Sequence, residues 1–374
     1  MAMSGAPILI LIGGIIGTEL APYPSWATLP IASMVTGLAL CTIPASLLMK
    51  RIGRRYGFIV GVAVAALASL GAAYAIMHHN FLLFCLAATL IGGNIAFVQQ
   101  YRFAAAESVE SPHTAKAISF VLLGGIAGGY LGPEIAKRTI DWLEYGKYTG
   151  PFIGLTGLYL LTAILLFFLR DVKYKESEAT GEERPLPVII KQPLYYTALL
   201  AGVISYGIMS LLMTATPINM HILCGFSLED TAWVIQSHVI AMYFPSLFTG
   251  YLVNRFGLFK IMASGVLILL VCLGVGLIAA KLLHYWLALV LLGVGWNFLF
   301  VGGTILLTQS YRPVERFKSQ ALNDFVIFGI QAISSLSAGT LIYFGGWEML
   351  NYLSMPLLAV MLLVLLLRPR SKHS

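Results

Sequence analysis

The stretch RIGRRYG at residues 51–57 has a counterpart 204 positions later, RFGLFK at residues 255–260. A second pair, NIAFV at 94–98 and NFLFV at 297–301, recurs after 203 positions. Two matches at nearly one offset indicate that the chain consists of two repeats of the same architecture. The polar stretch DVKYKESEATGEERP at 171–185 lies between the repeats and is typical of a flexible linker.

The composition predicts an integral membrane protein. Hydrophobic residues make up 59% of the 374 positions, charged residues make up 10%, and the mean hydropathy is +0.86. A soluble domain of this length does not tolerate so apolar a composition. Cys41, Cys85, Cys224 and Cys272 mostly lie within apolar segments, so neither a disulfide framework nor a CxxC zinc motif is expected.

Apolar segments of about 20 residues, enough to cross a bilayer core of about 30 Å as helices, occur twelve times. We expect membrane spans near residues 6–23, 27–49, 57–77, 81–108, 115–139, 151–170, 192–221, 229–253, 258–280, 283–309, 317–342 and 346–367. Six fall on each side of the linker. The sequence therefore predicts an all-α membrane fold with two pseudo-symmetric six-helix bundles, 1–170 and 192–374, joined by a cytoplasmic linker at 171–191.

The net charge of +7 follows this topology and does not indicate a nucleic-acid partner. Of the 23 Lys and Arg residues, Arg102 lies within a predicted span. The loops of one side hold only Lys137, Arg138, Lys147 and Lys281, and all the others fall on the opposite side. The positive-inside rule therefore predicts that both termini are cytoplasmic.

The repeated turn resembles a known family motif. SLLMKRIGRR from Ser46 and GYLVNRFGLF from Gly250 are similar to the G-x-L-x-D-R-x-G-R-R loop between the second and third helices of the major facilitator superfamily. The turn glycines and basic residues agree, whereas Lys50 and Asn254 stand at the family's acidic position. That acid latches the inner gate in the family, so the resemblance implies the fold without the usual latch.

A second motif, GGYLGP from Gly128, resembles the Gly-x-x-x-Gly-Pro core of the superfamily's antiporter motif on the fifth helix. Close helix packing by small residues explains these glycines equally well. The resemblance covers essentially the whole chain. It implies a transporter that works by alternating access between two bundles, not an enzyme, and without a permanently bound cofactor.

Two pairs of soft ligands stand at helical spacing on neighbouring spans. Met209 and Met213 are four apart in the seventh span, and His238 and Met242 are four apart in the eighth, so each pair is predicted to share a helix face. The SLED run from Ser227 is typical of a helix start, which places His238 about 15 Å below the outer surface. The methionines of the seventh span lie at a similar depth, where such transporters bind substrate.

These ligand types favour copper. Thioethers suit Cu(I) and imidazole accepts either copper state, whereas hard cations require carboxylates that this set lacks. The alternative is that the methionines fill irregular gaps in a helical bundle.

The pattern is similar to that of the CcoA-like copper importers of the superfamily. M-x-x-x-M on the seventh helix and H-x-x-x-M on the eighth are the signature of these bacterial proteins, which supply copper for assembly of the cbb-type cytochrome c oxidase. The resemblance implies that Met209, Met213, His238 and Met242 bind copper in transit, and that Cys224 contributes a membrane thiol. The same wider group includes riboflavin transporters, so membership alone does not identify the substrate.

Two lesser sets complete the candidate residues. Capture of copper on the outer side is assigned to Met77, His78, His79, Met220 and His221. Coupling or gating is assigned to the ionisable residues near span ends, which are Glu19, Arg102, Glu107 and Asp324. For this second set, structural pairing is an alternative.

The sequence therefore predicts a copper importer of the bacterial inner membrane. Its partners would be the copper ion, the lipid bilayer, and periplasmic or cytoplasmic copper chaperones. The main alternative is an organic-solute transporter, either a riboflavin importer or a drug-proton antiporter. An aromatic interior that includes Tyr206, Trp233, Tyr243 and Trp296 favours this alternative because such rings stack on a flat solute.

Overall fold

The computed structural model describes residues 1–101, 104, 114–143, 146–169, 184–278, 281–312 and 315–367. Within these ranges every regular element is a helix. The elements are α1 (Gly5–Leu20), η1 (Pro24–Trp26), α2 (Leu29–Ile52), α3 (Arg54–Met77), α4 (Phe81–Gln99), α6 (Thr114–Thr139), α7 (Thr149–Phe167), α8 (Leu186–Ile190), α9 (Pro193–Pro217), η3 (Ile218–Leu223), α10 (Leu228–Tyr243), α11 (Ser246–Phe256), α12 (Leu258–Leu277), α13 (Leu282–Thr308) and α14 (Arg316–Leu366). The predicted linker lies outside the described residues up to position 183.

Each of the twelve expected spans corresponds to helix. The expected eighth span is divided into α10 and α11, and the last two spans are the two arms of α14. These arms meet at Gly346, where a φ of 68° breaks the helical path. By length and composition, eight helices of the described chain are long and apolar enough to cross a membrane, and α1 is a shorter apolar helix.

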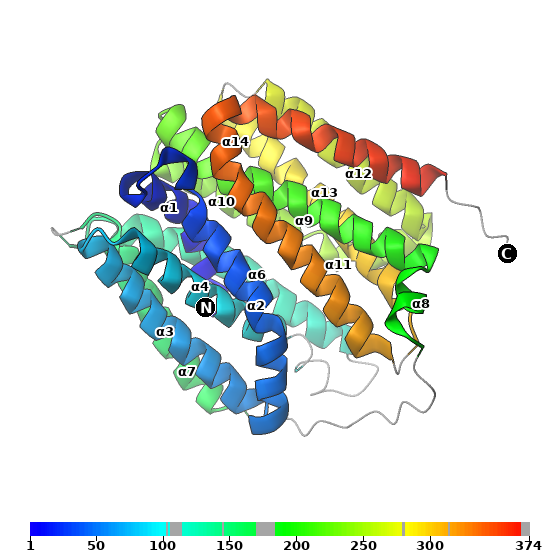
Figure 1. Cartoon of the computed structure of the whole chain (residues 1–374), viewed down its shortest axis with the longest axis horizontal. Helices are drawn as coiled ribbons and strands as arrows, with labels where there is room; N and C mark the ends of the chain where they lie inside the picture. Colours follow the sequence, from blue (N-terminus) through cyan, green and yellow to red (C-terminus); the bar gives the residue numbers. More distant parts are fainter. Residues whose placement is uncertain are drawn as a thin grey trace.

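The helices form two bundles (Figure 1). The N-terminal half, α1 to α7, lies at the lower left of the view, and the C-terminal half, α9 to α14, lies at the upper right. The halves meet where α2 packs on α14, α6 packs on α10, and α1 packs on α9. The α2–α14 contact and the α10–α6 contact are therefore the same contact in the two repeats, because α2 corresponds to α10 and α11, and α1 packs on its own counterpart α9.

The two copies of the basic turn adopt the same conformation. Gly53 ends α2 with a φ of 85°, and Gly257 ends α11 with a φ of 91°. These values lie in the left-handed region that side chains with a Cβ rarely adopt, and each glycine is followed at once by the next helix. The structure confirms the predicted turns. The side chains of Lys50 and Asn254 are not among those described.

The break between α10 and α11 follows from Pro245, which lacks the N–H needed to continue the helix. Asn297 of α13 stabilises this break. Its Nδ2 donates to the Met242 carbonyl at 2.7 Å and to Ser246 Oγ at 2.6 Å, and its Oδ1 accepts from Thr249 Oγ1 at 2.9 Å. The Met242 carbonyl at the end of α10 is thus satisfied inside the bundle, as membrane-spanning backbone requires.

Two hydrogen bonds join the halves on the outer side of the interface, meaning the side on which α1 ends and α2 begins. Gly339 N of α14 donates to Thr28 Oγ1 at 3.0 Å, and Gln236 Nε2 of α10 donates to the Tyr130 carbonyl of α6 at 3.2 Å. A Cβ added at Gly339 would lie 2.5 Å from Thr28 Oγ1 and 2.7 Å from the Ser25 carbonyl oxygen. Only glycine therefore permits this approach of α14 to α2.

Candidate functional site

A cavity of about 160 Å³ lies between the two halves. The N-terminal half lines it with Met3, Ala6, Pro7, Ile10, Ile31, Met34, Val35, Leu38, Ile95, Val98, Gln99 and Gly125. The C-terminal half lines it with Tyr206, Met209, Ser210, Met213, Thr214, His238, Val239, Met242, Tyr243, Phe328 and Gln331. No side chain among these described lining residues carries a formal charge at neutral pH when His238 is neutral.

The structure brings the two soft-ligand pairs together. Met209 and Met213 from α9, and His238 and Met242 from α10, all line this one cavity, and all four are buried. Ser227 caps the start of α10 by accepting from the Asp230 N–H at 2.9 Å, as the SLED run predicts. This placement is consistent with the common depth expected for the two pairs. A role of the four side chains as metal ligands stays a prediction.

His238 has one ring nitrogen engaged and one without a partner. Its Nδ1 lies 2.8 Å from the Leu289 carbonyl oxygen of α13. A carbonyl only accepts, so Nδ1 carries the proton and Nε2 carries a lone pair. Nε2 is buried without a hydrogen-bond partner among the described residues. The cavity therefore presents a neutral imidazole with an acceptor that is available to a ligand.

The close approach of α13 to α10 holds His238 and Met242 in place. A Cβ at Gly293 would lie 2.8 Å from the His238 carbonyl oxygen and 2.9 Å from Met242 N, so only glycine fits between these helices. One turn further along α13, Asn297 holds the Met242 carbonyl. The two ligand positions of α10 are therefore fixed to α13 along one contact.

Aromatic side chains form one wall of the cavity. Tyr206, Tyr243 and Phe328 line it, and Trp296 packs behind them with ring centroids 5.2 Å from Tyr206 and 6.3 Å from Tyr243. The expectation for Trp233 was wrong. Its side chain is 44% exposed and stacks on Trp286, so it lies on the surface of the bundle and not in the interior.

The other predicted metal ligands lie away from the cavity. Cys224 is exposed at the end of η3, with Sγ 3.5 Å from Tyr285 Oη. Met77, His78 and His79 are exposed at the end of α3 and directly after it. His221 Nδ1 donates to the Phe226 carbonyl at 2.8 Å. Among the described residues, no group of three or more His, Cys, Asp and Glu side chains could hold a metal ion. Buried Met220 completes this set without lining the cavity.

Of the predicted coupling residues, the two that the structure describes, Glu19 and Asp324, do not line the cavity either. Glu19 is exposed at the outer end of α1, where it interacts electrostatically with Lys147, His79 and His221. Asp324 accepts a hydrogen bond from Asn323 Nδ2 at 3.2 Å near the start of α14. Arg102 and Glu107 lie outside the described residues. A coupling role for these four residues stays a prediction.

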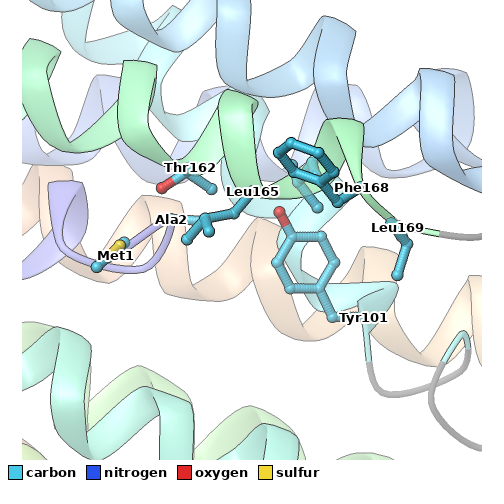
Figure 2. A pocket seen from close by; sticks show the side chains of 8 residues that line it. Met1, Ala2, Tyr101, Thr162, Leu165, Phe168 and Leu169 are labelled. Atoms are coloured by element: carbon cyan, nitrogen blue, oxygen red, sulfur yellow. The ribbon is translucent and has the colours of Figure 1, made fainter.

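A second pocket, of about 520 Å³, lies within the N-terminal half (Figure 2). The ring of Tyr101 lies next to Leu165 and Phe168 at the end of α7, and Met1 and Ala2 close the other side. Its lining is mostly apolar and comes from one half only. It contains none of the predicted ligands, so the cavity between the halves is the stronger candidate for a transport site.

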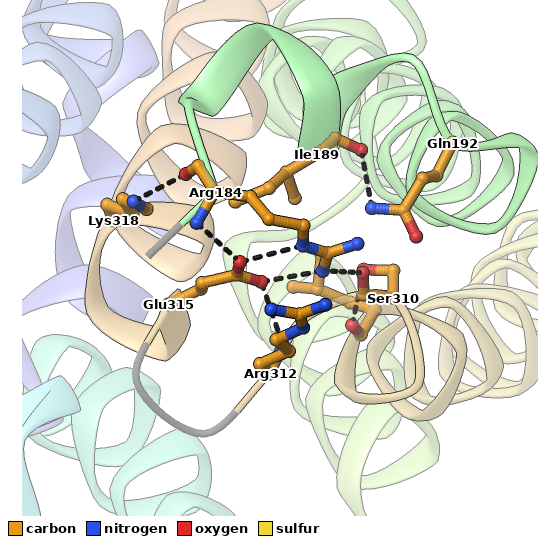
Figure 3. A network of polar contacts seen from close by, with 8 residues as sticks. Arg184, Ile189, Gln192, Ser310, Arg312, Glu315 and Lys318 are labelled. Carbon is orange, nitrogen blue, oxygen red and sulfur yellow. Dashed lines mark hydrogen bonds and ion pairs between the residues drawn. The ribbon is translucent and has the colours of Figure 1, made fainter. Parts of the chain in front are cut away.

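A polar network fastens the end of the linker to the C-terminal half (Figure 3). Arg184 binds the buried carboxylate of Glu315 through Nε at 2.7 Å and Nη2 at 2.6 Å. The backbone N–H groups of Arg184 and Arg312 each donate to the same carboxylate at 2.9 Å, and Lys318 donates to the Arg184 carbonyl at 2.8 Å. The hydrogen bonds from Arg184 hold the pKa of Glu315 far below its ordinary value.

Comparison with known proteins supplies the family. The family described as Major Facilitator Superfamily matches residues 1–316 and 198–374 of the chain. The chain belongs to this superfamily. It is therefore a multi-pass membrane transporter and not an enzyme.

Relatives match most or all of the chain. The riboflavin transporter RfnT of Brucella anthropi is 39% identical over 374 residues, which cover 100% of this chain and 94% of that protein. The Bacillus subtilis transporters YddS and YdeG are each 29% identical, cover 89% of this chain, and are matched over 79% and 80% of their own lengths.

A solved structure matches the fold. A bacterial homologue of the human lysosomal transporter Spinster, inward-facing and unoccupied, has a TM-score of 0.73 at 13% identity. The match covers 97% of this chain and 92% of that chain. At this identity the likeness supports the fold alone.

Sequence motifs did not identify several residues that line the cavity or hold its lining helices in place. Gln331, Ser210 and Thr214 are polar lining residues that stand alone in apolar spans, and Asn297 holds the break after Met242. Asn297 had a signal in the repeat, because it matches Asn94 in NIAFV and both are buried polar residues. A buried amide at the same place in both repeats indicates a structural role.

Proposed function

We propose that this chain is a secondary transporter that takes up riboflavin, or a closely similar flat and neutral solute, across the bacterial inner membrane. The observation that carries the proposal is the 39% identity with a riboflavin transporter over the entire chain. This proposal reverses the order of the two sequence-based hypotheses, since the organic solute was the alternative to copper.

The chemistry of the cavity supports a neutral aromatic solute. Tyr206, Tyr243 and Phe328 offer ring surfaces, and the thioethers of Met209 and Met213 offer soft apolar contact. His238 Nε2 and Gln331 Oε1 are buried acceptors without partners among the described residues. Riboflavin has a flat ring system, hydrogen-bond donors and no charge at neutral pH, so it complements both features.

The size of the cavity implies that the halves must separate to admit such a solute. Ligand pockets for drug-sized molecules are commonly about 300–1,000 Å³, whereas this cavity is about 160 Å³. The hydrogen bond between Gly339 and Thr28 also joins the halves on the outer side. We therefore infer that the solute enters and leaves by rocking of the two halves, with the cavity widest when one side is open.

Copper remains a second candidate because Met209, Met213, His238 and Met242 line the same cavity. Three thioethers and one neutral imidazole are suitable ligands for Cu(I). A third candidate, exchange of a cationic drug for protons, has less support. None of the described lining residues is a carboxylate that could pair with a cation.

Paired uptake assays test the proposal. The chain would be expressed in bacteria that cannot synthesise riboflavin and lack their own transporter, and in bacteria that lack copper import. We expect growth on micromolar riboflavin and uptake of labelled riboflavin in the first strain, with no rise in cell copper or oxidase activity in the second. Copper accumulation without riboflavin uptake would overturn the proposal and restore the copper hypothesis.

A further inference from the structure

His238 carries a lone pair on Nε2 that has no hydrogen-bond partner among the described residues. The imidazole is fully buried, and its protonated Nδ1 donates to the Leu289 carbonyl. This bond fixes the tautomer and the ring orientation, so that Nε2 can only accept. A buried acceptor without a partner costs free energy, so such a group calls for a donor from outside the chain, such as a water molecule or a ligand.

The neighbours of His238 in the cavity do not provide that donor. Met242 and Met213 present thioethers, which have no proton to donate, and Val239 presents an apolar side chain. The Thr214 hydroxyl is already in a hydrogen bond of 3.0 Å with Ser335 Oγ. None of these lining side chains donates a hydrogen bond to Nε2, which has no partner among the described residues.

The position of the acceptor is rigid. Gly293 lets α13 contact the His238 backbone, Leu289 on the same helix holds Nδ1, and Asn297 holds the Met242 carbonyl one turn along α10. Three points of α13 thus fix the imidazole with respect to the C-terminal half. A fixed acceptor discriminates between solutes by the position of their donors better than a mobile one does.

We propose that His238 Nε2 accepts a hydrogen bond from the ring-edge imide N–H of the transported flavin and so determines specificity for that donor. The proposal rests on the proposed function, because it assigns a role within the same site. The ring would lie between the thioethers of Met209, Met213 and Met242 and the aromatic wall of Tyr206 and Tyr243. His238 acts here as a binding residue for a neutral N–H group, and no charge is exchanged.

A comparison of two solutes tests the assignment. The first is riboflavin, and the second is riboflavin methylated at the imide nitrogen, which has the same ring and side chain but no donor at that edge. In whole-cell uptake, the wild type is expected to prefer riboflavin by at least about fivefold in uptake efficiency, because the methylated ring leaves Nε2 unsatisfied. In His238→Ala the preference is expected to fall to about onefold.

Two further variants separate binding from folding. His238→Gln retains a side-chain acceptor and is expected to restore part of the preference. Met213→Leu alters the same cavity without touching the acceptor, and it is expected to keep the full preference. Because the measured quantity is a ratio of two solutes, lower expression of a variant does not change it.

The outcomes are distinguishable. Equal uptake of both solutes by the wild type would overturn the assignment of His238 and leave riboflavin transport intact, as would an unchanged preference in His238→Ala. Absence of uptake of either flavin by the wild type would instead overturn the proposed function. If His238→Ala does not reach the membrane, the wild-type ratio and the His238→Gln ratio still decide the question.

Discussion

The two walls of the central cavity differ although the two halves are repeats of one fold. The N-terminal wall is built mainly from aliphatic residues, such as Ile31, Val35 and Ile95, and Gln99 is its one amide among the described residues. The C-terminal wall carries the imidazole, the amide of Gln331, two tyrosines and three of the methionines. The two halves thus share a helix arrangement, while the imidazole, the tyrosines and most of the thioethers of the cavity belong to the second repeat.

This difference suggests that the two walls of the cavity have separate roles in transport. The C-terminal wall is held internally, since α13 fixes His238 and Met242 of α10. The smooth N-terminal wall can separate from it without breaking polar contacts to the solute, because apolar contact is non-directional. We infer that the solute stays with the C-terminal half while the N-terminal half closes over it. Four predictions test this comparison, in order of decreasing effect.

The largest effect on riboflavin uptake is expected from a substitution that keeps the two halves from closing over the cavity. Gly339→Ala would place a Cβ 2.7 Å from the Ser25 carbonyl oxygen, which belongs to backbone and cannot rotate away. We expect riboflavin uptake to fall more than about tenfold, while binding of riboflavin to purified protein changes little. Gly329→Ala on the same helix is the matched control, because nothing described lies within 4 Å of its added Cβ. Normal uptake by Gly339→Ala would show that this approach is not needed for transport.

An intermediate effect is expected from the amides of the two walls. Gln331→Leu removes a buried acceptor of the C-terminal wall, and we expect uptake efficiency to fall about fivefold, the effect of roughly one hydrogen bond. Gln99→Leu changes the N-terminal wall in the same chemical way, and we expect less than about a twofold change. Initial rates of labelled riboflavin uptake measure both. If the two losses are equal, recognition is shared between the walls and the comparison fails.

A small effect is expected from the thioethers. Replacing both Met209 and Met213 by Leu keeps volume and apolar character but removes two soft metal ligands. For a flavin transporter we expect uptake within about threefold of wild type, with cell copper unchanged. The readouts are flavin uptake and cell copper measured by mass spectrometry. A fall in cell copper would identify the methionines as copper ligands, and the organic-solute proposal would be refuted if the wild type also showed no flavin uptake.

The sequence predicted which residues of α9 and α10 line the cavity better than it predicted the chemical character of the whole cavity. Spacing of four residues placed Met209 with Met213 and His238 with Met242, and all four line one cavity. Ligand chemistry then favoured copper, because periodicity describes one helix at a time. Gln331 and Phe328 approach from α14, whereas Tyr206 shares a face of α9 with Met209 and Met213, three and seven residues further on. No local pattern links the residues of α14 to those of α9, so their contribution to the cavity emerged only from packing.

Helix boundaries were likewise predicted only in part from the sequence. The twelve spans were visible as apolar segments, and the turns at Gly53 and Gly257 were visible as a repeat. The break at Pro245 was not predicted, although proline is a local signal, because apolar sequence continues on both sides. Trp233 was assigned to the interior, but membrane helices expose apolar and aromatic residues to lipid, so hydrophobicity does not identify the inward face.

The smallest effect on transport is expected from the network behind the C-terminal wall, since Arg184 and Glu315 line no part of the cavity. Glu315→Gln removes one charge of this ion pair, and we expect the unfolding midpoint of the purified protein at pH 7 to fall by a few degrees, with riboflavin KM unchanged. The folded-state pKa of Glu315 is depressed, so its stabilisation is present at neutral pH and is lost only as pH falls through that low pKa. The difference between wild type and Glu315→Gln should therefore persist at pH 5. Glu134→Gln is the control, because among the described residues Glu134 pairs only with Lys137 and Arg138 of its own helix α6, one turn away, and it should change the midpoint less than Glu315→Gln does. Equal midpoints for wild type and Glu315→Gln would show that the network does not stabilise the half that carries recognition.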